Sequence, residues 1–344
     1  MNKVNTALPN ISSWRKWLLR ICLVAVVLSI ILIVTTFTLG QFAIQELQKE
    51  YPPSGKLVDM GGYNLHLDCK GEGSPTIILE AGLNEFSLTW HYIHQELAKY
   101  TRTCAYDRAG LGWSDSSNAQ RTSETLVTEL HDLLQSADIE SPYLLVGHSY
   151  GGVLARLYTY HYPSDVVGIV LIDATHEDMF TRMPEVFKSS TEQLIQQFQT
   201  LVALSRFGLL ALSTEQIPVI NVPDGVHDDY RAILASPSYF EGAVAETQAF
   251  EESLSIMADY DSSLENLPLT IISRGQSEPL PFMLDDQIER LEMVWAELQL
   301  ALLDLSTNSR HIIVENSGHY IHISEPALVI DAVRDMLDIV QSSD

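Results

Sequence analysis

A serine flanked by glycines is the feature of this 344-residue chain with the clearest chemistry. Residues 147–151 read Gly-His-Ser-Tyr-Gly, after an apolar run at 143–146 and before a stretch of helical periodicity. Where a strand turns sharply into a helix, the central serine is strained, and side chains at the flanking positions would collide with neighbouring elements. Its hydroxyl is exposed near the positive end of the helix, which stabilises developing negative charge. The pattern therefore predicts that Ser149 is a nucleophile.

The hydrophobic pattern of the remaining chain predicts the elements that hold this serine. Eight apolar or alternating runs predict strands, at residues 56–60, 63–69, 76–80, 101–106, 143–146, 166–172, 269–273 and 311–314. Helices are predicted at residues 88–99, 122–137, 287–303 and 326–340, and from the serine turn to about residue 162. Strands that alternate with helices predict an α/β fold with a mostly parallel, eight-stranded sheet covered on both faces.

One long segment interrupts this alternation. Residues 177–267 read as helical pieces separated by loops rich in Pro, Asp and Gly. We interpret this segment as a helical lid, inserted between two strands of a single domain that covers residues 55–344.

Four motifs, in this order along the chain, resemble those of the α/β-hydrolase family. They are Leu-Glu-Ala-Gly at 79–82, Tyr-Asp-Arg-Ala-Gly-Leu-Gly-Trp-Ser at 106–114, the serine turn at 147–151, and Ser-Gly-His at 317–319. The resemblance covers the chain from residue 56 to its end and implies the α/β-hydrolase fold. Ala81 replaces the histidine of the family's His-Gly motif, but the donor there is a backbone N–H. The Glu-Ala-Gly variant resembles a subgroup of membrane-anchored bacterial hydrolases.

The resemblance also implies partners for the serine. A serine hydroxyl needs a base to take its proton, and in this fold the base follows the last strand. His319 has that position, and His322 is the alternative. His148 adjoins the serine, but the neighbouring residue in such a turn points away, so we assign it a structural role. By the same resemblance, the backbone N–H groups of Leu83 and Tyr150 stabilise the oxyanion.

The sequence leaves the acid of the triad open. An acid must hold the tautomer of the base and stabilise its charged form. Asp173 follows the strand at 166–172, where some family members carry the acid, and is our first choice. Glu278 is in register with the more common position after the next strand. Asp285 and Asp286 are further alternatives, and Asp173 can also simply cap the next segment.

Other chemistries find little support in the sequence. No Cys/His spacing resembles a zinc site, and the glycines at 110 and 112 lack the remainder of a dinucleotide-binding motif. We therefore expect no metal and no cofactor. The family members with an aspartate nucleophile, the dehalogenases and epoxide hydrolases, are disfavoured because Ser149 occupies that place.

The N-terminal region predicts a membrane anchor. Residues 17–39 are almost wholly apolar and long enough to span a bilayer. A cleavable signal has a shorter apolar region, and the residues at 38–40 match a cleavage site only weakly. Lys3, Arg15, Lys16 and Arg20 precede or begin the segment, so we expect a cytoplasmic N-terminus and an exported catalytic domain. Residues 1–45 form this anchor region, and residues 46–54 form a linker.

Charge and cysteines limit the partners and the compartment. Beyond residue 45 the chain has 45 acidic and 16 basic side chains, a net charge of −29, which excludes electrostatic attraction to nucleic acid. Cys69 and Cys104 lie in separate predicted strands. In an exported domain they form either a disulfide or two buried thiols, and the sequence does not decide between these.

These features together predict a membrane-anchored serine hydrolase that acts on a small ester or acyl substrate. A non-catalytic member of the fold, which binds a ligand in the same pocket, is one alternative. An acyltransferase or cofactor-free perhydrolase that uses the same serine is another. The sequence does not separate hydrolysis from acyl transfer, because the outcome depends on which nucleophile reaches the acyl-enzyme.

Overall fold

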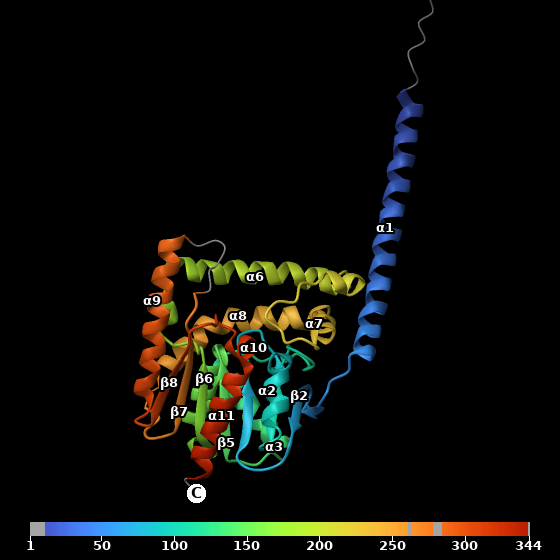
Figure 1. The fold of residues 1–344 in the computed structure, drawn as a ribbon. Coiled ribbons are helices and arrows are strands. Elements are labelled where there is room, and N and C mark those ends of the chain that lie inside the picture. Colours follow the sequence, from blue (N-terminus) through green and yellow to red (C-terminus); the bar gives the residue numbers. More distant parts are fainter. Residues whose placement is uncertain (1–10, 261–262, 278–283, 343–344) are drawn as a thin grey trace, which may run out of the picture.

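The fold combines a long N-terminal helix with a layered α/β body (Figure 1). The computed structural model describes residues 11–260, 263–277 and 284–342. The body has the α/β-hydrolase architecture predicted from the sequence, with a central sheet, helices on both faces, and a helical layer over one edge of the sheet (Figure 1).

The sheet has eight strands in the order β1-β2-β4-β3-β5-β6-β7-β8. Their bounds are β1 (Lys56–Asp59), β2 (Asn64–Lys70), β3 (Thr76–Glu80), β4 (Thr103–Tyr106), β5 (Tyr143–His148), β6 (Val166–Ile172), β7 (Leu269–Arg274) and β8 (Ser309–Val314). The β1–β2 and β2–β4 pairs are antiparallel, whereas the other pairs are parallel. Because parallel strands align their carboxyl ends, the loops after β3, β5, β6 and β8 lie close together at that end of the sheet.

Two apolar layers fix this sheet between helices. Helices α2 (His91–Leu97) and α11 (Pro326–Gln341) pack on one face, around Val146 and Ile172. Helices α3 (Ser123–Ser136), α4 (Tyr150–His161) and α9 (Asp285–Ala301) pack on the other face. The strands are buried on both sides, which explains why β5 and β6 are continuous apolar runs.

Short elements differ from the sequence prediction. The helix predicted at 88–99 begins instead as a 3-10 turn, η1 (Ser87–Trp90), and continues as α2. The one-turn helix α10 (Ile321–Ser324) was not predicted, because four residues carry too little periodicity to identify a helix.

Helices α5 (Met179–Arg182), α6 (Glu185–Arg206), α7 (His227–Leu234) and α8 (Pro237–Ala258) lie between β6 and β7 in the chain. They lie across the carboxyl ends of the parallel strands, with α6 outermost (Figure 1). Helices α6 and α8 pack on one another, and α8 also contacts α3 and α4. The segment predicted as a lid thus forms a helical layer above the carboxyl ends of the strands.

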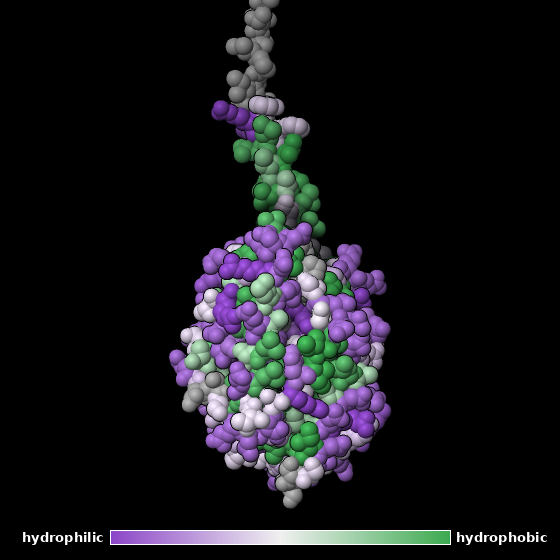
Figure 2. Space-filling model, turned by 60° about the vertical axis from the view of Figure 1, so that its left-hand side comes forward, coloured by the Kyte–Doolittle hydropathy of each residue, from purple (hydrophilic) through white to green (hydrophobic). Residues whose placement is uncertain are grey.

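Helix α1 (Ile11–Glu50) is long and apolar enough to cross a membrane. It projects from the body, and its projecting part is largely hydrophobic (Figure 2). Residues 46–50, which we expected in the linker, continue the helix instead. The lower part of α1 contacts the lid: Phe37 meets Phe207 edge to face at 6.0 Å, and the backbones of Gly40 and Gly208 approach closely.

Cys69 and Cys104 form a disulfide. They are directly paired residues of the antiparallel strands β2 and β4. The pairing places two side chains on the same face of neighbouring strands, which brings their sulfur atoms within bonding reach.

Candidate active site

Ser149 occupies the sharp turn between β5 and α4. Its backbone has φ 52° and ψ −119°, an unusual conformation for a residue other than glycine. The Ser149 N–H donates to the carbonyl oxygen of Ile172 at 3.0 Å, which ties the turn to β6. A Cβ atom at Gly147 or Gly151 would overlap neighbouring backbone. The glycine spacing found in the sequence therefore reflects real crowding around this turn.

Asp173 follows β6 and is completely buried. Its carboxylate accepts four hydrogen bonds: from His319 Nδ1 (2.6 Å), from the side chain and backbone of Arg274 (2.7 and 3.1 Å), and from Trp295 Nε1 (3.0 Å). Burial alone would raise the pKa of Asp173, but the His319 hydrogen bond and the Arg274 charge hold it well below its usual range. The group is therefore a carboxylate at neutral pH.

His319 lies in the loop after β8, as predicted. Because its Nδ1 donates to the Asp173 carboxylate, Nε2 of the neutral ring is the nitrogen that can accept a proton. Ser149 and His319 line the same cavity, which has a volume of about 310 Å³. The structure thus brings together the predicted nucleophile, base and first-choice acid around one site.

The other candidates have different surroundings. Glu278 lies outside the described residues. Asp285 and Asp286 are exposed in the first turn of α9, where they favour the helix N-terminus. His322, the alternative base, is buried against Trp90, with ring centroids 4.7 Å apart, and does not line the cavity.

The turn after β3 is held by one buried cation, Arg108. Its guanidinium donates to the carbonyl oxygens of Ala81 (2.9 Å) and Gly82 (2.6 Å), and it pairs with Glu80 (2.9 Å) and Glu246 (2.6 Å). Glu246 belongs to α8, so this network connects the lid to the core. This contact explains Arg108 of the motif at 106–114, whereas Asp107 accepts hydrogen bonds from the backbone N–H groups of Ser87 (2.7 Å) and Trp113 (2.9 Å).

The two predicted oxyanion donors follow the turns after β3 and β5. Tyr150 is the first residue of α4, and Leu83 follows the turn fixed by Arg108. Within the described residues, neither backbone N–H has an intramolecular acceptor. Leu83 and Ser149 both line the cavity. Among the residues that the structure describes, neither donor N–H is therefore engaged in a hydrogen bond that a bound carbonyl oxygen would have to displace.

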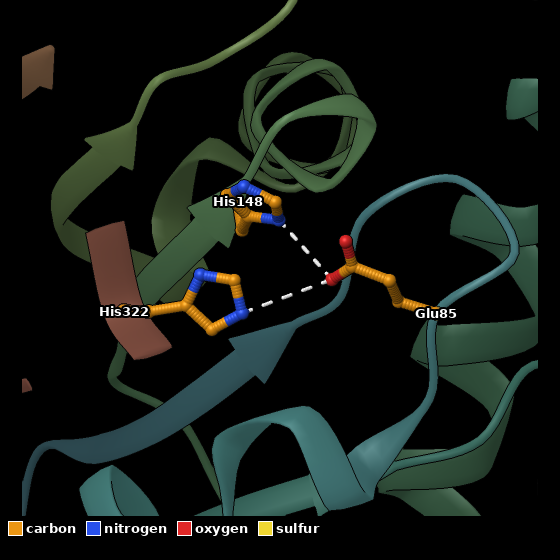
Figure 3. Close-up of side chains that lie close together, drawn as sticks. All are labelled: Glu85, His148 and His322. Atoms are coloured by element: carbon orange, nitrogen blue, oxygen red, sulfur yellow. Dashed lines mark hydrogen bonds and ion pairs between the residues drawn. The ribbon is translucent and has the colours of Figure 1, made fainter. Parts of the chain in front are cut away.

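A buried cluster of Glu85, His148 and His322 was not anticipated from the sequence (Figure 3). His148 Nδ1 lies 3.1 Å from Glu85 Oε2, and His322 Nε2 lies 3.9 Å from the same oxygen. No pattern marks Glu85, which stands in a loop far from both histidines in the sequence. In the described part of the chain, these three are the residues whose spacing suits a metal ion. His148, however, lies between two hydrogen-bond acceptors, which favours a protonated ring over a metal ligand.

Comparison with known proteins identifies the family. Residues 77–332 match the Alpha/beta hydrolase family, so the chain belongs to this family. It is 30% identical over 272 residues to the uncharacterized protein YqjL of Bacillus subtilis, an alignment that covers 78% of this chain and 85% of that protein.

Solved structures show the same fold. An esterase from Exiguobacterium antarcticum superposes with a TM-score of 0.60 at 16% identity, over 83% of this chain and 99% of the esterase. A mutant epoxide hydrolase of Vigna radiata superposes with a TM-score of 0.63 at 16% identity, with the same coverage of both chains. At these identities the likeness concerns the fold, and family membership supports hydrolase activity without specifying the bond.

Proposed function

We propose that this protein is a serine hydrolase that cleaves an ester-like bond through an acyl-enzyme. The observation that carries the proposal is the proximity of three groups. Ser149 and His319 line one cavity, and His319 is hydrogen-bonded at 2.6 Å to the buried carboxylate of Asp173. This arrangement of nucleophile, base and orienting acid is the one that acyl transfer requires.

The chemistry assigns a role to each group. His319 Nε2 takes the Ser149 proton as the hydroxyl oxygen attacks the carbonyl carbon, and Asp173 stabilises the imidazolium that forms. The Leu83 and Tyr150 N–H groups hold the oxyanion. The tetrahedral intermediate collapses, His319 protonates the departing alcohol, and an acyl-serine remains. Water, deprotonated by His319, then releases the carboxylic acid and restores the serine.

The walls of the cavity favour an apolar acyl group. The apolar side chains that line it are Leu83, Met179, Met183, Phe187, Leu194, Phe250, Leu291 and Trp295. Several come from the lid, so the lid and the core form the cavity together. The flexible methionine side chains adapt to the shape of a bound group, and the apolar lining suits an acyl chain better than a compact charged group.

The proposed location is a membrane surface. In this proposal helix α1 is a single-pass anchor, and the basic residues Lys3, Arg15, Lys16 and Arg20, before and at the start of the helix, favour a cytoplasmic N-terminus and a hydrolase domain outside. The disulfide agrees with an oxidising exterior. Protease added to intact cells tests the orientation: the domain should be digested without lysis, whereas a protected domain contradicts it.

A fluorophosphonate probe tests the proposed function in the full-length protein. We expect labelling of the parent, no labelling of Ser149→Ala, and unchanged labelling of Ser253→Ala, which removes a buried serine on α8. Unlabelled parent protein is then offered chromogenic esters of increasing chain length, with the labelled protein as the inactive control. A folded parent that resists the probe would refute the proposal and favour a non-catalytic binding protein. Acyl transfer to an added alcohol in preference to water would identify an acyltransferase.

A further inference from the structure

Glu85 and His148 connect three loops of the site. The His148 ring, one residue before Ser149, has Nδ1 3.1 Å from Glu85 Oε2 and Nε2 3.0 Å from the backbone carbonyl oxygen of His319. The same Glu85 oxygen accepts a hydrogen bond from the Gly82 N–H at 3.1 Å. One pair of side chains therefore joins the turn after β3, the turn after β5 and the loop after β8.

The hydrogen bonds define the protonation state of His148. A backbone carbonyl can only accept, so Nε2 must carry a proton. Burial alone would raise the pKa of Glu85, but the charge of His148 and its hydrogen bond lower that pKa to about 2. As a carboxylate Glu85 also only accepts, so Nδ1 carries a proton as well, and the two charges of the pair stabilise one another. A ring with two N–H groups is an imidazolium.

The surroundings agree with a charged ring. Burial lowers the pKa of His148, but the Glu85 carboxylate raises it by more, and the net shift is upward. The other titratable groups that face the ring are Asp173, His319, Tyr320 and His322. Burial and the nearby His148 charge hold the pKa of His322 well below its ordinary value, so this neighbour adds no competing positive charge.

The absence of a side chain at Gly82 leaves space for the same ion pair. A Cβ atom there would lie 2.8 Å from Glu85 Oε1 and 2.9 Å from His148 Nδ1. Both distances are shorter than ordinary van der Waals contact, so a side chain at this position would separate the pair. The glycine of the turn after β3 thus leaves space for a charged contact that reaches the loop after β8.

We propose that Glu85 and a charged His148 are positioning residues. They hold His319 and the turn at Gly82 at fixed positions relative to Ser149. His319 is then fixed at its backbone by His148 and at its ring by Asp173. A misplacement of about 1 Å in such a site lowers the rate about a hundredfold. The catalytic consequence rests on the serine-hydrolase function proposed above, whereas the charge state of His148 does not.

Nitrogen NMR of the full-length protein in detergent micelles, with ¹⁵N-labelled histidine, tests the charge state directly. We expect one buried histidine with two ring N–H protons at pH 7, and its signal should vanish in His148→Asn. A neutral ring at His148 would overturn the proposal. This measurement is independent of activity, so it remains decisive if the fluorophosphonate probe fails to label Ser149.

The positioning role is tested with Glu85→Gln, which removes the charge and keeps the shape. We expect the labelling rate and kcat to fall about tenfold to a hundredfold. The alkaline limb of the pH profile should also move to lower pH, because His148 loses the carboxylate that keeps it protonated. Glu129→Gln is the matched control: Glu129 has the same 8% exposure and a buried ion pair with Arg121, but it lies on α3, away from the cavity.

Two results would contradict the positioning role. A Glu85→Gln protein with the parent's kcat and pH profile would show that the pair does not position His319. Equal losses in Glu85→Gln and Glu129→Gln, with the pH profile unmoved, would indicate a general effect on stability. Elemental analysis adds a further check: one metal ion per chain, lost in His322→Ala, would make the cluster a metal site and exclude an imidazolium at His148.

Discussion

Replacement of Asp173 by asparagine should inactivate the site while leaving the fold intact. Asn has one acceptor oxygen where Asp173 uses two, each of which accepts two hydrogen bonds. The new amide NH₂ group can replace either oxygen. In one orientation it faces the Arg274 backbone N–H and Trp295, and in the other it faces the Arg274 guanidinium and His319. The second orientation is favoured because the His319 ring can change tautomer and accept at Nδ1, whereas the other donors cannot become acceptors.

The expected magnitude follows from this tautomer. With Nδ1 unprotonated, Nε2 of His319 carries the proton and cannot take another from Ser149. The corresponding change in other triads lowers kcat by about 10⁴, so we expect a loss of about 10³–10⁴. Stability should fall less, by about 1–3 kcal/mol, because one Arg274 N–H loses its acceptor. Arg274 keeps its pairing with Glu292 at 3.1 Å, which limits the penalty.

Two variants serve as controls in this experiment. Glu292→Gln removes the other carboxylate partner of Arg274 without touching His319, and should label at nearly the parent rate. Glu278→Gln tests the alternative acid from the sequence. The assay is the second-order rate of fluorophosphonate labelling, beside thermal unfolding of each variant. If Asp173→Asn and Glu278→Gln are equally harmless, neither residue is the acid and the assignment fails.

Two further predictions concern stability. Replacement of both Cys69 and Cys104 by alanine should lower the free energy of unfolding by about 2–4 kcal/mol, since the bridge closes a loop with a sequence separation of 35; an unchanged denaturation midpoint in the oxidised protein would show that the bond contributes nothing. Burial raises the pKa of Glu80 to about 7 despite the charge of Arg108. The folded state therefore binds this proton more tightly than the unfolded chain, and stability should decline as pH rises from about 4.5 to about 7. Glu80→Gln should flatten this part of the profile in chemical denaturation, and an equally steep decline in the variant would exclude Glu80 as its source.

Much of the fold was predictable because its signals are local. Apolar runs at β3, β5 and β6 reflect strands buried on both faces, and the glycines at 147 and 151 mark a turn with no space for side chains. The mostly parallel, eight-stranded sheet predicted from these patterns is confirmed, and so is the α/β-hydrolase fold that the family resemblance implied. Boundaries were less predictable. Helix α1 runs to Glu50 because nothing in residues 46–50 breaks a helix, although their polarity resembled a linker.

The arrangement of the site depended on contacts between distant segments. Asp173 and Glu278 were both acceptable acids in the sequence, since each follows a strand. The tertiary structure places the carboxylate of Asp173 against His319, although the two are separated by 146 positions. Glu85 carries no motif, and only the packing of three loops reveals its contact with His148.

By itself, the sequence determined the sheet, the lid segment, the apolar N-terminal helix and the turn at Ser149, because periodicity and glycine spacing act over a few residues. It could not decide between a disulfide and two thiols, between the candidate acids, or which charges are buried together. Those outcomes depend on strand order and loop packing, which bring groups from distant parts of the chain within hydrogen-bonding distance. The charge of a buried histidine is likewise set by its neighbours in space, and only the tertiary structure determines them.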